Sequence, residues 1–339
     1  MELEIEVQCN WMPEWQNTGR VCNQREVMNI RDCPYCGGDH FGSSECPFND
    51  GPPQDNKRGG VVVNDLEAKA LWVRQQLWIM TMKAKRGHLP SCYSIVDILV
   101  ALYYGGILQH DPERPKASGR DRLIISKGHA NAALYPILSD RGFFPLEELH
   151  TYTEPGSRLG VFANPSLPGI EAISDSLGHG LGIACGMALA AKLDGQKIHR
   201  VFVVLGDAEL NEGSVWEAAA FAAHYHLESI TAIVDQNQLG ILGEPIGLRS
   251  LPERWQSFGW DVRKVDGHAF DMHKAKIGLM DIPSALREDH GLGKPMVLIA
   301  QTVKGKGVSF MEGRGEWHNK IPDQVLQRKG EEELGLNHA

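Results

Sequence analysis

Two short runs without charged residues, separated by a helical stretch, limit this chain to a small group of folds. Residues 201–205 (VFVVL) and 230–234 (ITAIV) have the composition of strands that are buried on both faces. The residues between them, at 214–225, have the composition of a helix. The three segments therefore predict a strand–helix–strand unit with parallel strands.

The alternation continues along the chain. Residues 260–267 (WDVRKVDG), a predicted helix at 271–279 and a predicted strand at 296–300 (MVLIA) extend it. Upstream, Asn64 and Asp65 can cap a helix over residues 66–85. Apolar residues recur at helical spacing in that stretch, at Leu66, Ala70, Val73, Leu77 and Met80. We therefore expect an α/β fold with a mostly parallel sheet and helices on both faces.

The cysteines divide the chain unevenly, because five of the seven lie in the first 46 residues. Residues 49–60 (NDGPPQDNKRGG) have the composition of a linker, rich in Pro, Gly and polar side chains. We expect a cysteine-rich module with its linker at 1–60 and a larger domain at 61–339. The odd number of cysteines argues against a disulfide framework and for a metal site near the N-terminus.

Cys33 and Cys36, in a Cys-Pro-Tyr-Cys pair followed by two glycines, resemble a zinc knuckle. The structural zinc site that we expect consists of Cys22, Cys33, Cys36 and Cys46, although Cys9 or His40 could replace Cys22. A segment this short and polar would gain stability from the metal. A glutaredoxin-type redox pair, an iron–sulfur cluster and unligated thiols are the alternatives.

Charge and hydropathy exclude several classes of protein. The 34 Lys and Arg residues against 43 Asp and Glu give a net charge of −9, with no basic cluster, which argues against a general nucleic-acid binder. The uncharged stretch 176–191 is too short to span a bilayer. The first ten residues lack the features of a secretory signal, so the sequence predicts a cytoplasmic protein.

Polar side chains follow both buried runs. Asp207 comes shortly after the first run and Asn237 shortly after the second. Because neighbouring parallel strands end at the same edge, these side chains and a backbone carbonyl could hold Mg²⁺ or Ca²⁺ together with phosphate oxygens. The helix beginning near Glu212 would direct its N-terminus to the same place, which favours an anion. The alternative is that Asp207 and Asn237 serve as turn and cap residues.

Several motifs in order along the chain resemble the transketolases. The stretches GDAELNEGSVWEA (206–218) and VDQN (234–237) resemble the thiamine diphosphate motif. The other matching stretches are KRGHLPS (85–91), DRLIISKGHA (121–130), LPGIEAISDSLGHGLGIACG (167–186), VDGH (265–268) and QTVKGKGVSFMEGRGEWHNK (301–320). The resemblance is to the N-terminal subunit of the split, two-chain type, and it implies the thiamine-diphosphate-binding fold. It leaves out residues 1–60.

The resemblance implies a set of cofactor-binding residues at the strand ends. It assigns Asp207, Asn237 and the backbone carbonyl of Leu239 to Mg²⁺. Gly206 matches a glycine that lets the backbone approach the diphosphate, and Ala208 follows the metal-binding Asp in the same motif.

The resemblance also assigns roles to side chains around the cofactor. His129 and His268 match histidines that contact the diphosphate and border the substrate channel. His88 matches a histidine near the reacting carbon, where it can handle substrate hydroxyl protons. Leu177 matches a residue that packs on the cofactor ring. Glu212 matches a glutamate at the subunit interface that couples paired sites.

Three departures from the family pattern bear on the substrate. Ala208 stands where the family has Gly, and Ser174 and Asp175 stand where it has Thr-Gly. Asn164 replaces a histidine that contacts the donor's two-carbon unit, and Asn can form hydrogen bonds but cannot be protonated. We therefore expect an altered donor or acceptor, with Asn164 and His88 as substrate contacts.

The resemblance further implies a partner protein. In this family the glutamate that acts on the cofactor's aminopyrimidine belongs to a second domain, and this chain ends soon after the EWHNK motif. We expect a separate partner subunit that supplies this glutamate, an α₂β₂ assembly, and no turnover by this chain alone.

The function that we expect is transfer of a two-carbon ketol unit from a ketose or hydroxypyruvate-type donor to an aldehyde. The nearest alternative is an acyl transferase subunit that decarboxylates a 2-oxo acid with the same cofactor. A non-catalytic zinc-containing scaffold is the alternative from another class. A dinucleotide-binding dehydrogenase is disfavoured, because the glycines at 178–182 have the wrong spacing and follow no buried strand.

Overall fold

The computed structural model describes residues 63–195, 200–241, 243–247, 250–288 and 293–336. The predicted boundary near residue 60 lies outside the described residues. So do the predicted zinc ligands Cys22, Cys33, Cys36 and Cys46 and their alternatives Cys9 and His40.

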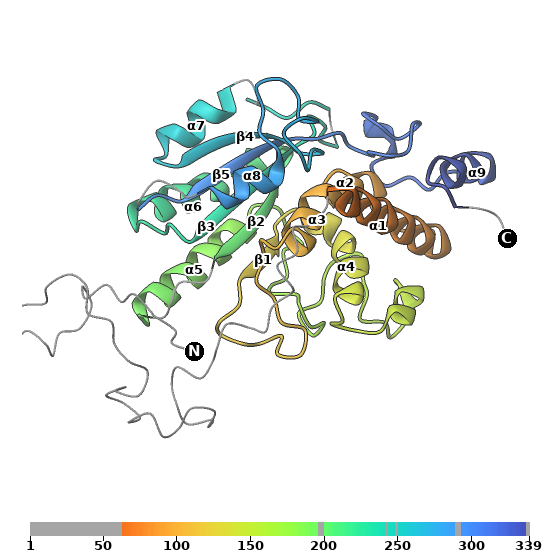
Figure 1. Ribbon diagram of the computed structural model, residues 1–339, viewed down its shortest axis with the longest axis horizontal. Coiled ribbons are helices and arrows are strands. Elements are labelled where there is room, and N and C mark those ends of the chain that lie inside the picture. The colour runs from red at the N-terminus through yellow and green to blue at the C-terminus, as the bar shows by residue number, and fades with distance from the viewer. Residues whose placement is uncertain (1–62, 196–199, 242, 248–249, 289–292, 337–339) are drawn as a thin grey trace, which may run out of the picture. The chain divides into compact units, whose positions relative to one another are not determined.

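A five-stranded parallel sheet organises the described residues (Figure 1). Its strands are β1 (Arg122–Ile125), β2 (Val201–Gly206), β3 (Ile230–Gln236), β4 (Asp261–Asp266) and β5 (Met296–Gln301). They lie in the order β1-β2-β3-β5-β4, and every neighbouring pair is parallel. The predicted parallel α/β fold is confirmed.

Each strand contributes side chains to two separate cores, because successive side chains point to opposite faces of a sheet. On β2, Phe202 and Val204 pack into one hydrophobic cluster, while Val201, Val203 and Leu205 pack into the other. All five side chains are buried, which explains why the strand is an uninterrupted apolar run in the sequence.

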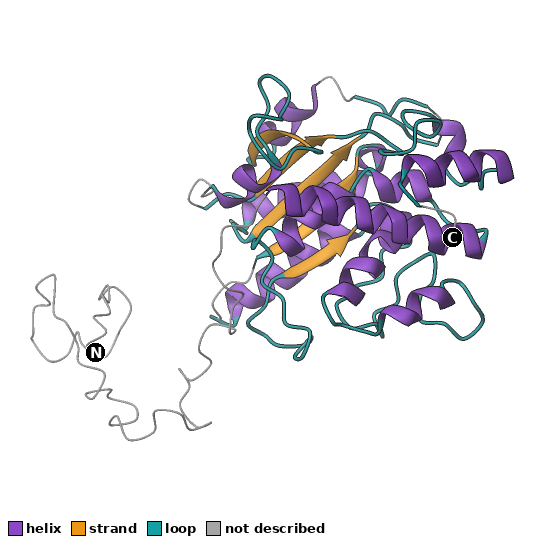
Figure 2. Cartoon of the chain, turned by 45° about the vertical axis from the view of Figure 1, so that its right-hand side comes forward, coloured by secondary structure: helices purple, strands orange, loops and turns teal. Residues whose placement is uncertain are grey.

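Helices cover both faces of the sheet, as Figure 2 shows. The first face packs against α1 (Val63–Ala84), α2 (Leu89–Tyr93), α3 (Val96–Tyr104), α4 (Leu134–Asp140) and α8 (Ile282–Arg287). The second face packs against α5 (Gly180–Leu193), α6 (Gly213–His224) and α7 (Leu251–Ser257). Helix α9 (Gln324–Glu333) lies against α1, where Gly330 fits closely over the ring of Trp78.

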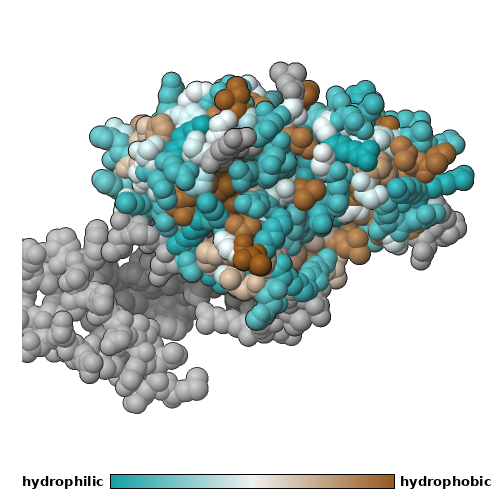
Figure 3. All heavy atoms as spheres, turned by 90° about the horizontal axis from the view of Figure 1, so that it is seen from above, coloured by the Kyte–Doolittle hydropathy of each residue, from teal (hydrophilic) through white to brown (hydrophobic). Residues whose placement is uncertain are grey.

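Short 3₁₀ helices occupy several of the connections: η3 (Gly128–Ala133), η4 (Leu146–Thr151), η5 (Ala208–Asn211) and η7 (Gly315–Trp317). Hydrophilic side chains cover most of the face seen in Figure 3, with hydrophobic ones interspersed. Within the described residues, no helix combines the length and the apolar character needed to cross a membrane.

The predicted helix at 271–279 is wrong. The structure has turns there, and Asp266 accepts from Lys276 N, an amide that would bond to the carbonyl oxygen of Met272 in a helix. The helix of this connection is α8, which begins after Asp281, whose side chain accepts from Ser284 N at 2.9 Å.

Candidate functional site

The carboxyl ends of β2 and β3 bring two predicted site segments together. Gly206 lies opposite Asp235 in the parallel register. Just beyond, the Asp207 carboxylate accepts a 2.5 Å hydrogen bond from Gln238 N and one of 2.8 Å from Ala208 N. Gln238 has a φ of 64°, an unusual backbone conformation for a residue with a side chain. The loop after β3 is therefore folded back onto Asp207.

Asp207 is a buried carboxylate without an opposing cation in its own hydrogen bonds. It is 2% exposed, and burial together with the charge of Asp235 raises its pKa to about 6. An acidic side chain in such surroundings would gain stability from a bound cation. Among the described residues, no group of three or more His, Cys, Asp or Glu could hold a metal, so a cation here would depend on amide and carbonyl oxygens as well.

The other two predicted metal ligands lie on the same loop. Asn237 Nδ2 donates to Asp235 Oδ2 at 2.8 Å, while Asn237 Oδ1 accepts from Leu239 N at 3.1 Å. The carbonyl oxygen of Leu239 accepts a hydrogen bond from Lys304 Nζ at 2.9 Å. Asp207, Asn237 and Leu239 thus share one edge of the sheet, although the structure does not test their role as metal ligands.

A buried ion pair lies beneath this edge. Lys127 Nζ is 2.5 Å from Asp235 Oδ2, and both side chains are almost completely buried. Asp235 also accepts from the hydroxyl groups of Ser94 and Thr302. Burial by itself would raise the pKa of Asp235, but the charge of Lys127 and these hydrogen bonds together lower it. The carboxylate thus stays ionised and joins β1, β3, β5 and the segment after α2.

Lys304 adds a second buried cation. It is 2% exposed and follows β5, and burial together with the charge of Lys127 lowers its pKa to about 8. Lys127 is already paired with Asp235, whereas Lys304 donates to a backbone carbonyl, so Lys304 is the cation that could meet the phosphate groups of a ligand.

Three histidines from distant parts of the sequence form a cluster, which we call the histidine triangle. The ring centroids of His88, His129 and His318 are 5.0–5.3 Å apart. Burial lowers the pKa of His129 to about 2 and that of His318 to about 4, and the charge of Lys304 adds to both effects. Burial also lowers the pKa of His88. Burial thus favours the neutral form of all three imidazoles.

Two nitrogen atoms of the histidine triangle have no partner. The Nδ1 atoms of His88 and His318 are buried and make no hydrogen bond with any described residue. Buried polar atoms are normally satisfied, so unpaired ones suggest a missing ligand or water. The triangle thus offers neutral donors or acceptors to a ligand hydroxyl or carbonyl group.

His268 lies outside the histidine triangle. Its Nδ1 atom is 2.6 Å from Asp97 Oδ2, and its Nε2 atom accepts a 2.8 Å hydrogen bond from Val303 N. Both ring nitrogens are thus used within the protein. The predicted contact of His268 with a cofactor stays untested.

Glu209 fixes the backbone around Gly206. It is 1% exposed and accepts hydrogen bonds from Gly206 N at 2.9 Å, Gly178 N at 2.8 Å and the Ser126 hydroxyl. A Cβ atom added at Gly206 would meet no atom closer than 3.7 Å. That distance is an ordinary van der Waals contact with Lys127, so Glu209 and Lys127 enclose Gly206 at the end of β2.

The remaining predicted site residues lie nearer the surface. Leu177 is half-buried beside Gly178, and Ala208 is half-buried after Asp207. Glu212 is exposed at the start of α6, and its side chain makes no capping hydrogen bond. Asn164 is exposed, and its Oδ1 atom accepts from Ser166 N at 2.9 Å. The roles assigned to these residues stay predictions.

Sequence reasoning did not single out Lys127, Asp235, Lys304 or His318 as site residues. All but Asp235 lie within the stretches 121–130 and 301–320, and Asp235 lies in the VDQN stretch. The sequence did contain a signal for these residues: a charged or imidazole side chain directly after an apolar run, or inside one of the glycine-rich motifs. Their convergence depends on contacts between segments up to 108 residues apart, as for Lys127 and Asp235.

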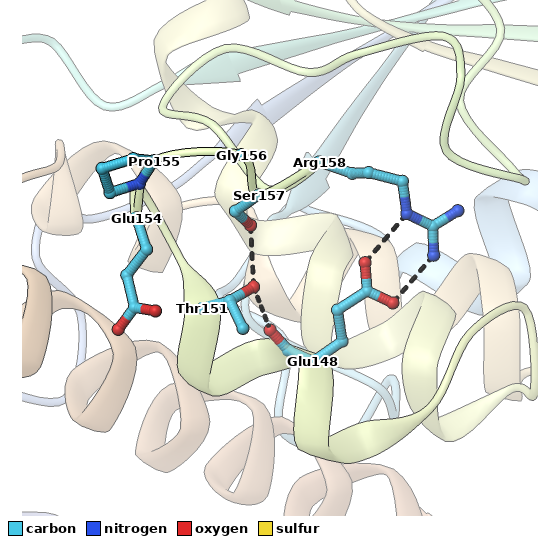
Figure 4. Close-up of a pocket in the computed structure, with 7 residues that line it drawn as sticks. All are labelled: Glu148, Thr151, Glu154, Pro155, Gly156, Ser157 and Arg158. Atoms are coloured by element: carbon cyan, nitrogen blue, oxygen red, sulfur yellow. Dashed lines mark hydrogen bonds and ion pairs between the residues drawn. The ribbon is translucent and has the colours of Figure 1, made fainter.

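A surface pocket lies elsewhere, formed by η4 and the turn that follows it (Figure 4). Its volume is about 380 Å³, and it is lined by Glu148, Thr151, Glu154, Pro155, Gly156, Ser157 and Arg158. Arg158 pairs with Glu148 through hydrogen bonds of 2.9 and 2.7 Å. None of the lining residues belongs to a strand end or to the histidine triangle, so the pocket is separate from the candidate site.

Comparisons with known proteins match most of the chain to one family. The family model described as "Transketolase, thiamine diphosphate binding domain" matches residues 73–337. An apulose-4-phosphate transketolase subunit of Phocaeicola vulgatus is 40% identical over 264 residues, which are 77% of this chain and 90% of that protein. The 6-deoxy-6-sulfo-D-fructose transketolase subunit SqwG of a Clostridium species is 37% identical over 267 residues, covering 77% and 93%.

Longer proteins match over part of their length. Human transketolase is 34% identical over 256 residues, which are 73% of this chain and 39% of the human protein. The crystal structure of transketolase from Campylobacter jejuni has a TM-score of 0.74 and 29% identity, covering 81% of this chain and 43% of that one. The chain thus spans less than half the length of these two proteins.

Proposed function

Because the chain belongs to the transketolase family, through its thiamine diphosphate binding domain, we propose that it is the cofactor-binding subunit of a two-chain transketolase. It would transfer a two-carbon ketol unit from a ketose or hydroxypyruvate-type donor to an aldehyde. The observation that carries the proposal is the histidine triangle with its unpartnered nitrogens, near the two buried lysines at the strand ends.

The described residues fit thiamine diphosphate with a divalent cation. Lys304, whose ammonium group bonds to the Leu239 carbonyl oxygen at 2.9 Å, supplies positive charge for a diphosphate, and Gly206 brings backbone without a side chain to the same edge of the sheet. Asp207, Asn237 and the carbonyl of Leu239 would hold Mg²⁺ or Ca²⁺, since all three offer hard oxygen ligands. When bound, the cofactor supplies a carbon nucleophile for the donor carbonyl. The predicted structural zinc at Cys22, Cys33, Cys36 and Cys46 stays a separate prediction.

The histidine triangle would act on the substrate. Neutral imidazoles at His88, His129 and His318 can donate or accept a hydrogen bond, so they can hold substrate hydroxyl groups and move their protons. Leu177 would pack on the cofactor ring. Exclusion of water from this half-buried cluster would strengthen each of these polar contacts.

A partner subunit completes the proposal. The names of two relatives, from Phocaeicola vulgatus and Actinobacillus succinogenes, describe each as one subunit of a transketolase, and this chain covers 90% and 95% of their lengths. We propose that a second chain supplies the catalytic glutamate and that the assembly is an α₂β₂ heterotetramer, with the exposed Glu212 at an interface between chains.

A specialised donor or acceptor is part of the proposal. The relatives' names refer to apulose 4-phosphate and 6-deoxy-6-sulfo-D-fructose, sugars with a phosphate or a sulfonate group. Asn164 and Asp175 depart from the family pattern on exposed segments, where they could contact substrate. We propose that this protein likewise acts in a specialised sugar pathway of the cytoplasm.

The test uses the chain copurified with its partner, with thiamine diphosphate, Mg²⁺ and an aldose acceptor. Hydroxypyruvate, a ketose phosphate and pyruvate are supplied separately, and the product is identified by mass. A ketose extended by two carbons is expected with one of the first two donors. A 1-deoxyketose formed from pyruvate and the aldose with loss of CO₂ would instead identify transfer of an acyl unit, and turnover by this chain without its partner would contradict the two-chain assignment.

A further inference from the structure

The loop that follows β5 carries Lys304, and hydrogen bonds hold it on both sides of this lysine. Before it, the hydroxyl group of Thr302 donates a hydrogen bond to Asp235, and Val303 N donates one of 2.8 Å to His268 Nε2. After it, Gly305 N donates to the carbonyl oxygen of Pro90 at 2.9 Å. The backbone of Lys304 is thus fixed by segments that are distant in sequence.

His268 links this loop to a buried ion pair. Asp97 Oδ2 lies 2.6 Å from both His268 Nδ1 and Arg74 Nη2, and the side chains of Asp97 and Arg74 are 6% and 8% exposed. Arg74 in turn donates from Nε to the carbonyl oxygen of Lys306 at 3.0 Å. The pair therefore holds the loop at two points, through His268 and directly through Arg74.

The hydrogen bonds define the protonation of His268. A backbone N–H can only donate, so His268 Nε2 must be an unprotonated acceptor toward Val303. The single ring proton is then on Nδ1, where it faces the Asp97 carboxylate. No lone pair or proton of His268 is left for a ligand, in contrast to the unpartnered nitrogens of His88 and His318.

We propose that His268 is a positioning residue that places Lys304 for the diphosphate, rather than a residue that contacts the cofactor. Asp97 orients the imidazole, the imidazole holds Val303, and Val303 fixes the next residue. The proposal rests on the proposed function, because it is there that Lys304 is assigned to the diphosphate. It replaces the role in direct contact that the family resemblance implied for His268.

Two substitutions separate the two hydrogen bonds of His268. The amide of His268→Asn can still donate to Asp97 but does not reach Val303, whereas the longer side chain of His268→Gln can offer an oxygen to Val303 N. The dissociation constant of thiamine diphosphate is measured by calorimetry on the complex of the full chain and its partner, with Mg²⁺. We expect about a tenfold increase for His268→Asn and less than about a threefold increase for His268→Gln.

A double-mutant cycle tests whether His268 acts through Lys304. In the Lys304→Met background, His268→Asn should add less than about a twofold further loss of affinity, because the group that it positions is gone. His273→Asn is the matched control, since His273 is an exposed histidine nearby, and it should leave the dissociation constant unchanged. Losses that multiply in the double variant would overturn the proposal.

Amide hydrogen exchange of the cofactor-free chain gives a second readout. Protection of the Val303 amide should fall in His268→Asn and persist in His268→Gln. Unchanged protection in His268→Asn would also overturn the proposal. If the wild-type complex binds no thiamine diphosphate, the proposed function fails, whereas exchange at Val303 still decides whether His268 holds the loop.

Discussion

Lys304 extends from the loop after β5 to the carbonyl oxygen of Leu239, which its ammonium group meets at 2.9 Å. This oxygen is one of the three groups that we assign to a divalent cation. A lysine ammonium group and a metal ion would compete for it and repel each other, although both would attract a diphosphate.

Lys304→Met should therefore change the affinities for the metal and for the cofactor in opposite directions. Mg²⁺ alone should bind the cofactor-free chain several times more tightly, because the competing positive charge is removed. Thiamine diphosphate with Mg²⁺ should bind the complex with the partner about tenfold more weakly, because a charge-assisted hydrogen bond is lost. Calorimetric titrations measure both constants, and Lys306→Met, which removes a more exposed lysine two residues away, is the control. A parallel change in the two constants would contradict this assignment.

Asp207→Asn should stabilise the chain while removing its cation site. Burial and the nearby Asp235 raise the pKa of Asp207 to about 6, so its charge costs stability in the metal-free protein. Removing the buried charge should increase the free energy of unfolding. The amide also loses part of the hydrogen bonding from Ala208 N and Gln238 N, so the net gain should be only about 1 kcal/mol. Urea denaturation measures the gain, and the exposed Asp194→Asn is the control. Mg²⁺-dependent cofactor binding should be lost, and a chain that is less stable than wild type would contradict this interpretation of Asp207.

Asp97→Asn should alter how stability depends on pH. Burial by itself would raise the pKa of Asp97, but attraction to Arg74 and hydrogen bonds from His268 and Arg74 outweigh it, so the pKa falls from an ordinary 3.8 to about 2. An acid with a depressed pKa stabilises the fold above pH 4, and this contribution is lost as the pH falls from about 4 to 2. The shift corresponds to about 2 kcal/mol.

The measurement compares urea denaturation of wild type and Asp97→Asn at neutral pH and near pH 3. At neutral pH the variant should be about 3–5 kcal/mol less stable, because Arg74 is left buried without its counter-ion. This difference should narrow in acid. Asp140→Asn, which breaks the more exposed pair with Lys69, should cost less than about 1 kcal/mol. A difference for Asp97→Asn that stays constant with pH would show that the ionised pair does not contribute.

Asn164→His should raise activity toward ordinary ketose donors. The substitution introduces the imidazole that the family resemblance assigns to this position, and Asn164 is exposed, so the larger ring can be accommodated. We expect the kcat/KM for a ketose phosphate to rise several-fold in the complex with the partner. Asn164→Ala is the control. It removes the hydrogen bond from Ser166 N without adding a ring, so it shows how much of any change comes from losing that bond and how much from the imidazole. No increase in the histidine variant would rule out position 164 as a determinant of the donor.

The sheet could be predicted from the sequence because its central strands are buried on both faces. The apolar character of Val203 and Ile233 is a local property, and parallel pairing then puts Asp207 and Asn237 at the same edge without further information. The prediction of a helix at 271–279 failed because Asp266 binds the backbone amide of Lys276, and composition does not reveal that competition.

Much of the candidate site depends on contacts that no local pattern specifies. His268 looks like any histidine in a short motif, and its place outside the histidine triangle follows from Asp97, which is 171 residues away. Lys304 likewise is a lysine between a valine and a glycine until the fold brings the carbonyl of Leu239 within hydrogen-bond distance of it. The motifs identified the segments that contribute to the candidate site. Which side chains of those segments face the edge of the sheet depends on tertiary packing.

The hydrogen bond from Arg74 to the carbonyl of Lys306 spans 232 residues of sequence. During translation, at about 5–20 residues per second, Arg74 would leave the ribosome roughly 10–50 s before its acceptor is made. Arg74 and Asp97 can pair earlier, because they are only 23 residues apart, but the Nε–H of Arg74 lacks its acceptor until then, so this part of the core is completed only when the loop carrying Lys304 arrives. The protein could therefore bind an anion at the sheet edge only late in folding, after the loop carrying Lys304 is in place. Ligand binding would then indicate that the fold is complete.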